Sequence, residues 1–217
     1  DKEWESIILQ IIFILITYQK VFDFTHNDLH TNNIMYVKTD KKYLNYKYNS
    51  VYYKVPTYGK IYKIIDFGRA IYKFKGKQMC SDSFYPKGDA AGQYNFSIIN
   101  NNNKKEVLPN KAFDLCRLAC SLYDYFFDEF NDEESNSVEK LIGEWIKDDN
   151  GKNILYKSNG DERYPDFKLY KMISRKCTKE TPQAQLEKPI FKKYITSKKK
   201  LGKKSKIMNI DKIPELF

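Results

Sequence analysis

A stretch near the N-terminus is apolar on nearly every side, and it constrains the fold more than any other feature. Apolar residues recur at helical spacing through residues 4–18 and cover most of the circumference. A helix of this kind has to be buried. The apolar run at residues 7–16 is interrupted by Gln10 and is shorter than the roughly 18 residues that a membrane span needs. We therefore expect a core helix, no membrane partner, and an intracellular, cytoplasmic location.

The rest of the chain predicts one α+β domain that is mainly α. The chain has 217 residues, of which 41% are hydrophobic, enough for one substantial core. Short apolar or alternating segments predict strands at residues 34–37, 44–55 (as a hairpin around Asn49 and Ser50) and 61–65. Helical periodicity predicts helices at residues 113–127, 137–146 and 166–176, the last with Asp166 as its N-cap.

Positive charge is concentrated near the C-terminus. The net charge is +10, and lysines crowd residues 192–206. Such a run can bind nucleic acid or form a solvated extension. Tyr194 is the only aromatic residue there that could stack on a base, so a solvated basic tail at residues 196–217 is the favoured interpretation. Nucleic acid remains the alternative.

Two polar motifs stand in order around the short strands. Residues 26–33 read HNDLHTNN and follow the apolar helix, and the apolar run 61–65 leads directly into Asp66, Phe67 and Gly68. This pair resembles the catalytic loop and the metal-binding D-F-G motif of protein kinases. Each motif alone occurs by chance, whereas the ordered pair in this setting is specific. The resemblance covers residues 4–194 and is closest to kinase-like proteins of large nucleocytoplasmic DNA viruses.

The resemblance implies ATP- and Mg²⁺-dependent phosphoryl transfer. Asp28 would orient the attacking hydroxyl and accept its proton. Asn33 would offer a neutral amide oxygen to Mg²⁺, and Asp66 would supply the charged oxygen that this hard cation prefers. Location in a host cell or virion would follow from the viral likeness.

Four further residues are expected to support this site. The resemblance assigns His26 and Phe67 to packing around the D-F-G turn, and Gly68 would let the backbone turn sharply after Asp66. Asp114 leads the helix expected at residues 113–127 and resembles the kinase residue that anchors the backbone of the catalytic loop. An ordinary helix N-cap is the alternative for Asp114.

The resemblance also divides the chain. Residues 1–195 would form a protein-kinase-like C-lobe with small β-hairpins around the catalytic loop. An insertion would occupy about residues 38–60, as a docking hairpin or an inert surface decoration, and the activation segment about residues 66–111. No glycine-rich loop precedes the first helix, so the lobe that clamps the nucleotide is expected upstream, and the isolated fragment is expected to be inactive.

Several departures from the kinase pattern keep alternatives open. Asn27 replaces the arginine that commonly pairs with a phosphorylated activation loop, and no A-P-E sequence closes that segment. His30 stands where serine/threonine kinases usually have lysine and where small-molecule kinases often have histidine. A serine/threonine protein kinase with a protein substrate is the favoured function. A pseudokinase-like scaffold and a small-molecule kinase are the alternatives.

Overall fold

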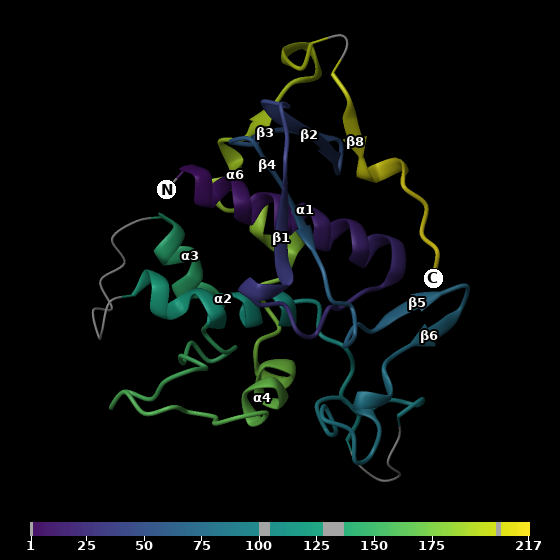
Figure 1. Cartoon of the computed structure of the whole chain (residues 1–217), viewed down its shortest axis with the longest axis vertical. Helices are drawn as coiled ribbons and strands as arrows, with labels where there is room; N and C mark the ends of the chain where they lie inside the picture. The colour runs from purple at the N-terminus through teal and green to yellow at the C-terminus, as the bar shows by residue number, and fades with distance from the viewer. Residues whose placement is uncertain (1, 100–104, 128–136, 203–204) are drawn as a thin grey trace.

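The computed structural model describes residues 2–99, 105–127, 137–202 and 205–217 and contains both helices and strands (Figure 1). About 36% of the chain is helical and 20% is strand, so the expected mixture of α and β, with more α, is confirmed. The helices are α1 (Lys2–Phe22), α2 (Phe113–Phe126), α3 (Ser137–Trp145), α4 (Lys168–Lys176), α5 (Pro182–Gln185) and α6 (Pro189–Lys192). The strands are β1 (Ile34–Lys38), β2 (Tyr43–Tyr48), β3 (Val51–Pro56), β4 (Lys60–Ile64), β5 (Tyr72–Phe74), β6 (Lys77–Met79), β7 (Ile195–Thr196) and β8 (Ile207–Asn209).

Helix α1 lies at the centre of the molecule, as its composition predicts (Figure 1). Its residues Leu9, Ile12 and Phe13 are fully buried in the main hydrophobic core. By length and composition α1 could cross a membrane, with a mean hydropathy of 1.5, but 67% of the apolar window is buried inside the protein. Burial of apolar surface against other elements is the behaviour of a core helix.

The strands form three separate small sheets. β1 pairs with β4 in antiparallel register, with Ile34 opposite Ile64, and β5 pairs with β6. The largest sheet has the order β7-β3-β2-β8, in which the β2–β3 hairpin turns at Asn49 and Ser50 as predicted. Both turn residues have positive φ, which fits a tight hairpin connection.

The segment expected as an insertion is part of the core. Tyr46, Tyr53 and Val55 point from the hairpin into the main hydrophobic cluster, and the Tyr46 ring stacks on Phe13 with centroids 4.2 Å apart. An inert surface decoration is therefore wrong, because removing this hairpin would expose the upper side of α1.

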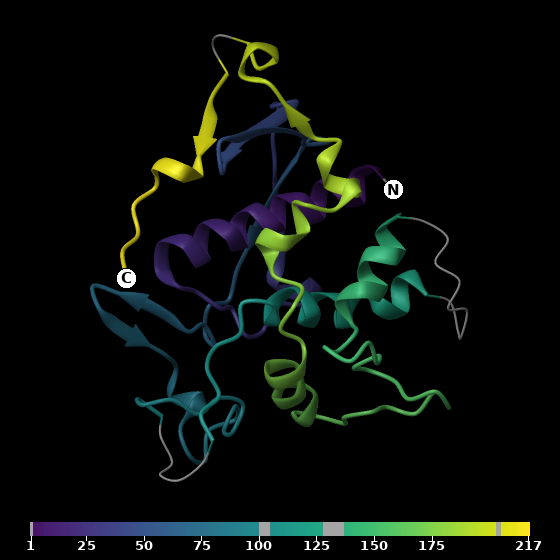
Figure 2. The same cartoon turned by 180° about the vertical axis from the view of Figure 1, so that it is seen from behind.

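The expected solvated tail is wrong for the described part of residues 196–217. β7 pairs with β3, and β8 pairs in parallel with β2, so this segment supplies both edge strands of the largest sheet. Ile210 is fully buried, and the Lys20 ammonium on α1 donates to the Ile210 carbonyl at 2.6 Å. In Figure 2 the C-terminal segment runs back past α1 toward β5. The domain boundary expected at residue 195 is absent.

Helices α2, α3 and α4 lie below α1 in Figure 1. α2 begins at Phe113, where the sequence predicts it, and α3 covers Ser137–Trp145 of the helix predicted at residues 137–146. α4 begins at Lys168, and Asp166 has a φ of 55° and lies outside the helix, so the predicted N-cap is wrong. Between Asp66 and α2 the chain is largely irregular, as expected, but Phe84 and Tyr94 belong to a small core of its own. The asparagine run at residues 100–103 lies outside the described residues.

Candidate catalytic site

The loop at residues 26–33 (loop 26–33) is held from below by Asp114, near the start of α2. The two oxygens of its fully buried carboxylate accept hydrogen bonds from the backbone N–H groups of His26 and Asn27, each at 2.9 Å. The helix N-cap position is Ala112, so the N-cap alternative for Asp114 is wrong. Its predicted role as the anchor of loop 26–33 is confirmed.

Burial raises the pKa of Asp114, whereas His26 and the two backbone N–H groups lower it in part. A carboxylate is buried only when its oxygens have hydrogen-bond donors, because desolvation alone disfavours the charged form. Both oxygens are used, so this residue fixes the loop backbone at two adjacent points. The anchor therefore determines where the next side chain, that of Asp28, projects.

The Asp28 carboxylate is partly exposed and has two partners that sequence reasoning missed. The Tyr170 hydroxyl, on α4, donates to Oδ1 at 2.7 Å, and the Arg69 guanidinium lies 3.7 Å from Oδ2. Arg117 on α2 in turn donates to the Tyr170 hydroxyl oxygen at 2.9 Å. Asp28 is thus an ionisable group at the surface, held by one hydroxyl and one cation.

Asn33 closes loop 26–33 back on itself. It is nearly buried, and its Nδ2 donates to the Asp28 carbonyl at 3.0 Å and contacts His30 Nε2 at 3.2 Å. The amide Oδ1 has no hydrogen-bond partner among the described residues. The amide nitrogen therefore bonds within the loop, and the amide oxygen can accept a hydrogen bond or bind a cation.

Asp66 lies two residues after Ile64, the last residue of β4, and adopts a left-handed conformation, with a φ of 60°. Such a conformation costs a residue other than glycine about 1 kcal/mol or more and is concentrated at functional sites. The sharp turn was expected at Gly68, but it is made by Asp66. Gly68 instead allows close approach, since its N–H donates to Asp66 Oδ1 at 3.2 Å, where an added Cβ would crowd the same oxygen.

His26 and Phe67 pack around this turn, as predicted. The His26 ring is fully buried, lies 5.5 Å from the Phe67 ring between centroids, and donates through Nε2 to the Ile65 carbonyl at 2.9 Å. His26 Nδ1 accepts from the Asp28 N–H at 3.3 Å. His26 therefore links loop 26–33 to Ile65, the residue before Asp66.

The two motifs meet through the β1–β4 pair. The Ile65 N–H donates to the Asn33 carbonyl at 3.0 Å, which brings the residue before Asp66 against the residue that ends loop 26–33. Burial lowers the pKa of His30, while the nearby carboxylates of Asp28 and Asp66 oppose that shift. Both carboxylates therefore act on one imidazole, and the site combines two acidic groups with one free amide oxygen.

Asn27 has a role that the sequence did not predict. It is fully buried with a φ of 66°, its Nδ2 donates to the Arg69 carbonyl at 3.0 Å, and its Oδ1 accepts from the Tyr94 hydroxyl at 2.6 Å. The side chain that replaces the expected arginine thus ties loop 26–33 to the segment after Gly68 by neutral hydrogen bonds.

Comparison with known proteins gives one informative match. An uncharacterized protein of Invertebrate iridescent virus 6, protein 098R, is 30% identical to the chain over 149 residues. The match covers 63% of this chain and 22% of that protein, so the chain spans about a fifth of its relative. No family model matches the chain. The relative is viral and its name states no activity, so the function has to be argued from the residues of the site.

Proposed function

We propose that the chain is the catalytic-loop lobe of an ATP- and Mg²⁺-dependent phosphotransferase, most simply a serine/threonine protein kinase. The observation that carries the proposal is the junction of the two motifs, in which Asn33 bonds to Ile65 and to Asp28. Phosphoryl transfer needs positioned metal oxygens beside a group that orients the attacking hydroxyl, and it needs little covalent help from the protein. A protein-kinase-like C-lobe is the fold that this proposal assigns.

The donor set fits Mg²⁺ held jointly by protein and phosphate. Among the described residues no cluster of three or more His, Cys, Asp or Glu side chains could hold a metal alone. Mg²⁺ is usually held by one or two carboxylates together with phosphate oxygens and water. Asp66 offers an exposed carboxylate and Asn33 an unengaged amide oxygen, so these two would hold the ion. When bound, Mg²⁺ neutralises phosphate charge.

Asp28 has the chemistry of the acceptor-orienting group. Its carboxylate already accepts a hydrogen bond from a hydroxyl, that of Tyr170, at 2.7 Å. A substrate hydroxyl would take the same place, and the carboxylate would accept its proton as the new O–P bond forms and the bond from the γ-phosphorus to the ADP leaving group breaks. The Arg69 guanidinium lies 3.7 Å from the other carboxylate oxygen, Oδ2.

An apolar surface beside the site supports a second lobe. Met35, Tyr36 and Val37 on β1 are about half exposed, and Ile65 and Phe67 next to Asp66 are also exposed. Contiguous exposed apolar side chains mark surfaces that bind another body. We propose that the nucleotide-clamping lobe, from sequence upstream of Asp1, covers this face.

A scaffold function is the second candidate, and one observation favours it. Tyr170 and Arg69 both occupy the Asp28 carboxylate in this structure, which is how a site that no longer turns over substrate could be closed. His30, which contacts Asn33, keeps a small-molecule acceptor open as well. All three candidates predict different outcomes in one assay.

The assay uses the natural protein with its upstream sequence and measures transfer of the ATP γ-phosphate to protein and small-molecule panels. We expect Mg²⁺-dependent transfer to protein hydroxyls, abolished by Asp66→Ala and lowered about 100-fold or more by Asp28→Asn. Asp40→Asn, an exposed carboxylate in the turn after β1, is the matched control and should retain full activity. Partner binding without any turnover would establish the scaffold, and transfer restricted to small molecules would replace the protein substrate.

A further inference from the structure

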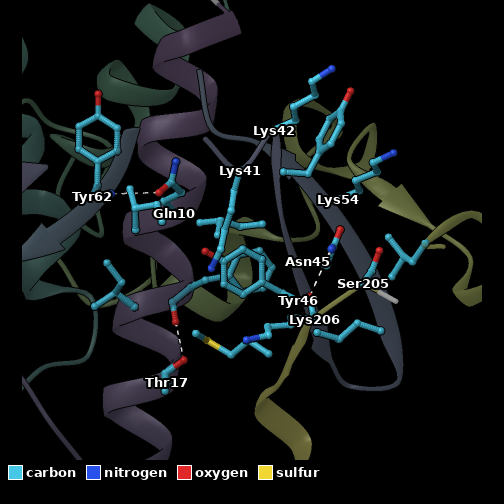
Figure 3. A pocket seen from close by; sticks show the side chains of 18 of the residues that line it. Gln10, Thr17, Lys41, Lys42, Asn45, Tyr46, Lys54, Tyr62, Ser205 and Lys206 are labelled. Carbon is cyan, nitrogen blue, oxygen red and sulfur yellow. Dashed lines mark hydrogen bonds between the residues drawn. The ribbon is translucent and has the colours of Figure 1, made fainter. Parts of the chain in front are cut away.

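A cavity of about 880 Å³ lies away from the candidate catalytic residues, between α1, β4, the β2–β3 hairpin and residues 200–202 and 205–208 (Figure 3). Its volume is in the range of small-molecule sites, about 300–1,000 Å³. None of Asp28, Asn33, Asp66 and Asp114 lines it. It exists because the C-terminal segment folds back to add β8 to the sheet, leaving space between that segment and α1.

All acidic or basic side chains that line the cavity are basic. Its lining contains no aspartate or glutamate and six lysines, namely Lys41, Lys42, Lys54, Lys63, Lys200 and Lys206. Within the described residues none of these ammonium groups forms an ion pair, although Lys54 lies over the Tyr43 ring at 4.1 Å. Unneutralised cations around a concave, low-dielectric wall create a positive potential that attracts anions.

The wall beneath the lysines is apolar. Phe13 and Ile14 contribute from α1, Ile64 from β4, and Leu201 and Met208 from the C-terminal segment. Such a surface gains free energy when an apolar group covers it, at roughly 25 cal/mol per Å². A small inorganic anion would leave this wall exposed to water, so the natural occupant has an apolar part as well as a charge.

One polar group in the wall lacks a partner. Asn45 lines the cavity, its Nδ2 donates to the Lys206 carbonyl at 3.3 Å, and its buried Oδ1 has no hydrogen-bond partner among the described residues. Buried polar atoms usually have one. A bound molecule with a polar atom below its charged head would satisfy this group.

We propose that the cavity binds an anionic amphiphile, with an apolar chain against α1 and a phosphate head among the lysines. Lysine ammonium groups bind phosphate as mobile point charges, so several of them along one cavity tolerate varied head positions. A single-stranded nucleic acid would need stacking rings on an open surface, whereas the stacked pair here, Phe13 and Tyr46, is buried in the core. The proposal does not depend on the phosphotransferase function.

The test titrates the 217-residue chain by calorimetry with dodecyl phosphate below its micelle concentration. Inorganic phosphate carries the head alone, and dodecyl maltoside carries the same chain with a neutral head. We expect one saturable site for dodecyl phosphate that weakens with added salt, and at least tenfold weaker binding of the other two. Flotation with phosphatidylcholine vesicles containing phosphatidic acid would assign a membrane lipid as the source, and binding without flotation a free amphiphile.

Two variants locate the site. Lys41→Gln with Lys42→Gln should weaken dodecyl phosphate binding roughly fivefold, because each exposed charge contributes on the order of 0.5 kcal/mol. The matched control is Lys77→Gln with Lys147→Gln, exposed lysines that do not line the cavity, and it should bind like wild type. Ile14→Glu, checked for folding by circular dichroism, places a carboxylate on the apolar wall and should abolish binding.

Three results would overturn the proposal. The first is equal binding of dodecyl phosphate and dodecyl maltoside, since the lysines would then contribute nothing. The second is that the Lys77/Lys147 control weakens dodecyl phosphate binding as much as the Lys41/Lys42 variant does, which would mean that only the net charge of the protein matters. The third is displacement of dodecyl phosphate by a single-stranded oligonucleotide that binds more tightly, which would assign this surface to nucleic acid.

Discussion

Loop 26–33 and the four-stranded sheet lie on either side of α1 and are held by different forces (Figure 1). The loop depends on buried polar groups, above all the Asp114 carboxylate with its two hydrogen bonds. The sheet depends on apolar packing against α1 and on strand pairing between distant parts of the chain, such as Asn45 with Ile207. In the loop much of the stability depends on one polar residue, whereas in the sheet it is shared among many apolar contacts. The loss of unfolding free energy on single substitutions should therefore differ between the two regions.

The largest expected effect is that of Asp114→Ala. The change leaves two buried backbone N–H groups without acceptors, each costing about 1–3 kcal/mol, so we expect a loss of about 4 kcal/mol in the free energy of unfolding. Urea denaturation measures it. Asp124→Ala, an exposed aspartate on the same helix, is the control and should cost less than about 1 kcal/mol. A small loss for Asp114→Ala would mean that the loop does not depend on this anchor.

Tyr46→Ala tests the sheet in the same way. Removing a buried aromatic ring that stacks on Phe13 leaves a cavity, and we expect a loss of about 3 kcal/mol. Tyr43→Ala, on the same strand but 45% exposed, should change the unfolding free energy much less. Equally small losses of unfolding free energy for both variants would mean that the hairpin is a surface decoration and not part of the core.

Ile210→Ala tests whether the C-terminal segment belongs to the folded domain. Ile210 is fully buried against the main core, so its truncation should cost about 2 kcal/mol. Met208→Ala on β8 is the control, because its side chain is 52% exposed. Truncation of a residue in a solvated tail would have no effect on thermal unfolding. Such a result for Ile210→Ala would contradict the pairing of β8 with the sheet.

How far the sequence predicts each region depends on the range of its contacts. Asp28 and Asn33 lie in one loop, and Asp66 follows a strand that pairs locally with β1, so motif order was sufficient to place them. The partners of β2 and β3 come from a lysine-rich stretch in which no local pattern indicates two short strands. The pairing of Asn45 with Ile207 joins residues 162 apart, and that of Tyr52 with Thr196 joins residues 144 apart. The Asp166 cap failed because Phe167 takes the cap position, a choice of backbone conformation that composition leaves open.

Asp23 is a partly buried carboxylate whose electrostatic contribution to stability should be weaker than that of Asp114. Burial would raise its pKa, but hydrogen bonds with Lys111 and Lys73 outweigh burial and lower it below the ordinary value of 3.8. A lowered carboxyl pKa stabilises the fold above the unfolded-state value, and that stability is lost as the pH falls through the folded-state pKa. Burial also lowers the pKa of Lys111, so the net gain should be only on the order of 1 kcal/mol.

The measurement compares wild type with Asp23→Asn across pH. The difference in unfolding free energy should be largest near about pH 6, should shrink as the pH falls below the ordinary aspartate pKa, and should vanish below the lowered folded-state pKa, where both proteins carry a neutral side chain. Asp40→Asn, an exposed aspartate without a described partner, should show no such pH dependence. A difference that persists at low pH would mean that shape, not charge, makes Asp23 important.

Tyr170→Phe has the smallest expected effect on stability. Tyr170 combines the features of the two regions, because it makes a long-range contact with a residue of loop 26–33. Tyr170 lies 142 residues from Asp28, so this contact is as unpredictable as the sheet, yet it reaches into the loop that the motifs predicted. Losing a partly exposed hydroxyl should cost about 1 kcal/mol of stability or less, because water can replace it at Asp28. The same loss frees the carboxylate for a substrate hydroxyl, and about 1 kcal/mol corresponds to roughly a fivefold higher rate in the proposed transfer reaction.

Tyr164→Phe, whose hydroxyl contacts Lys176 away from Asp28, is the control and should leave the rate unchanged. A slower Tyr170→Phe enzyme would instead show that the hydroxyl positions Asp28 for catalysis, and the occupied carboxylate would then be part of the working site.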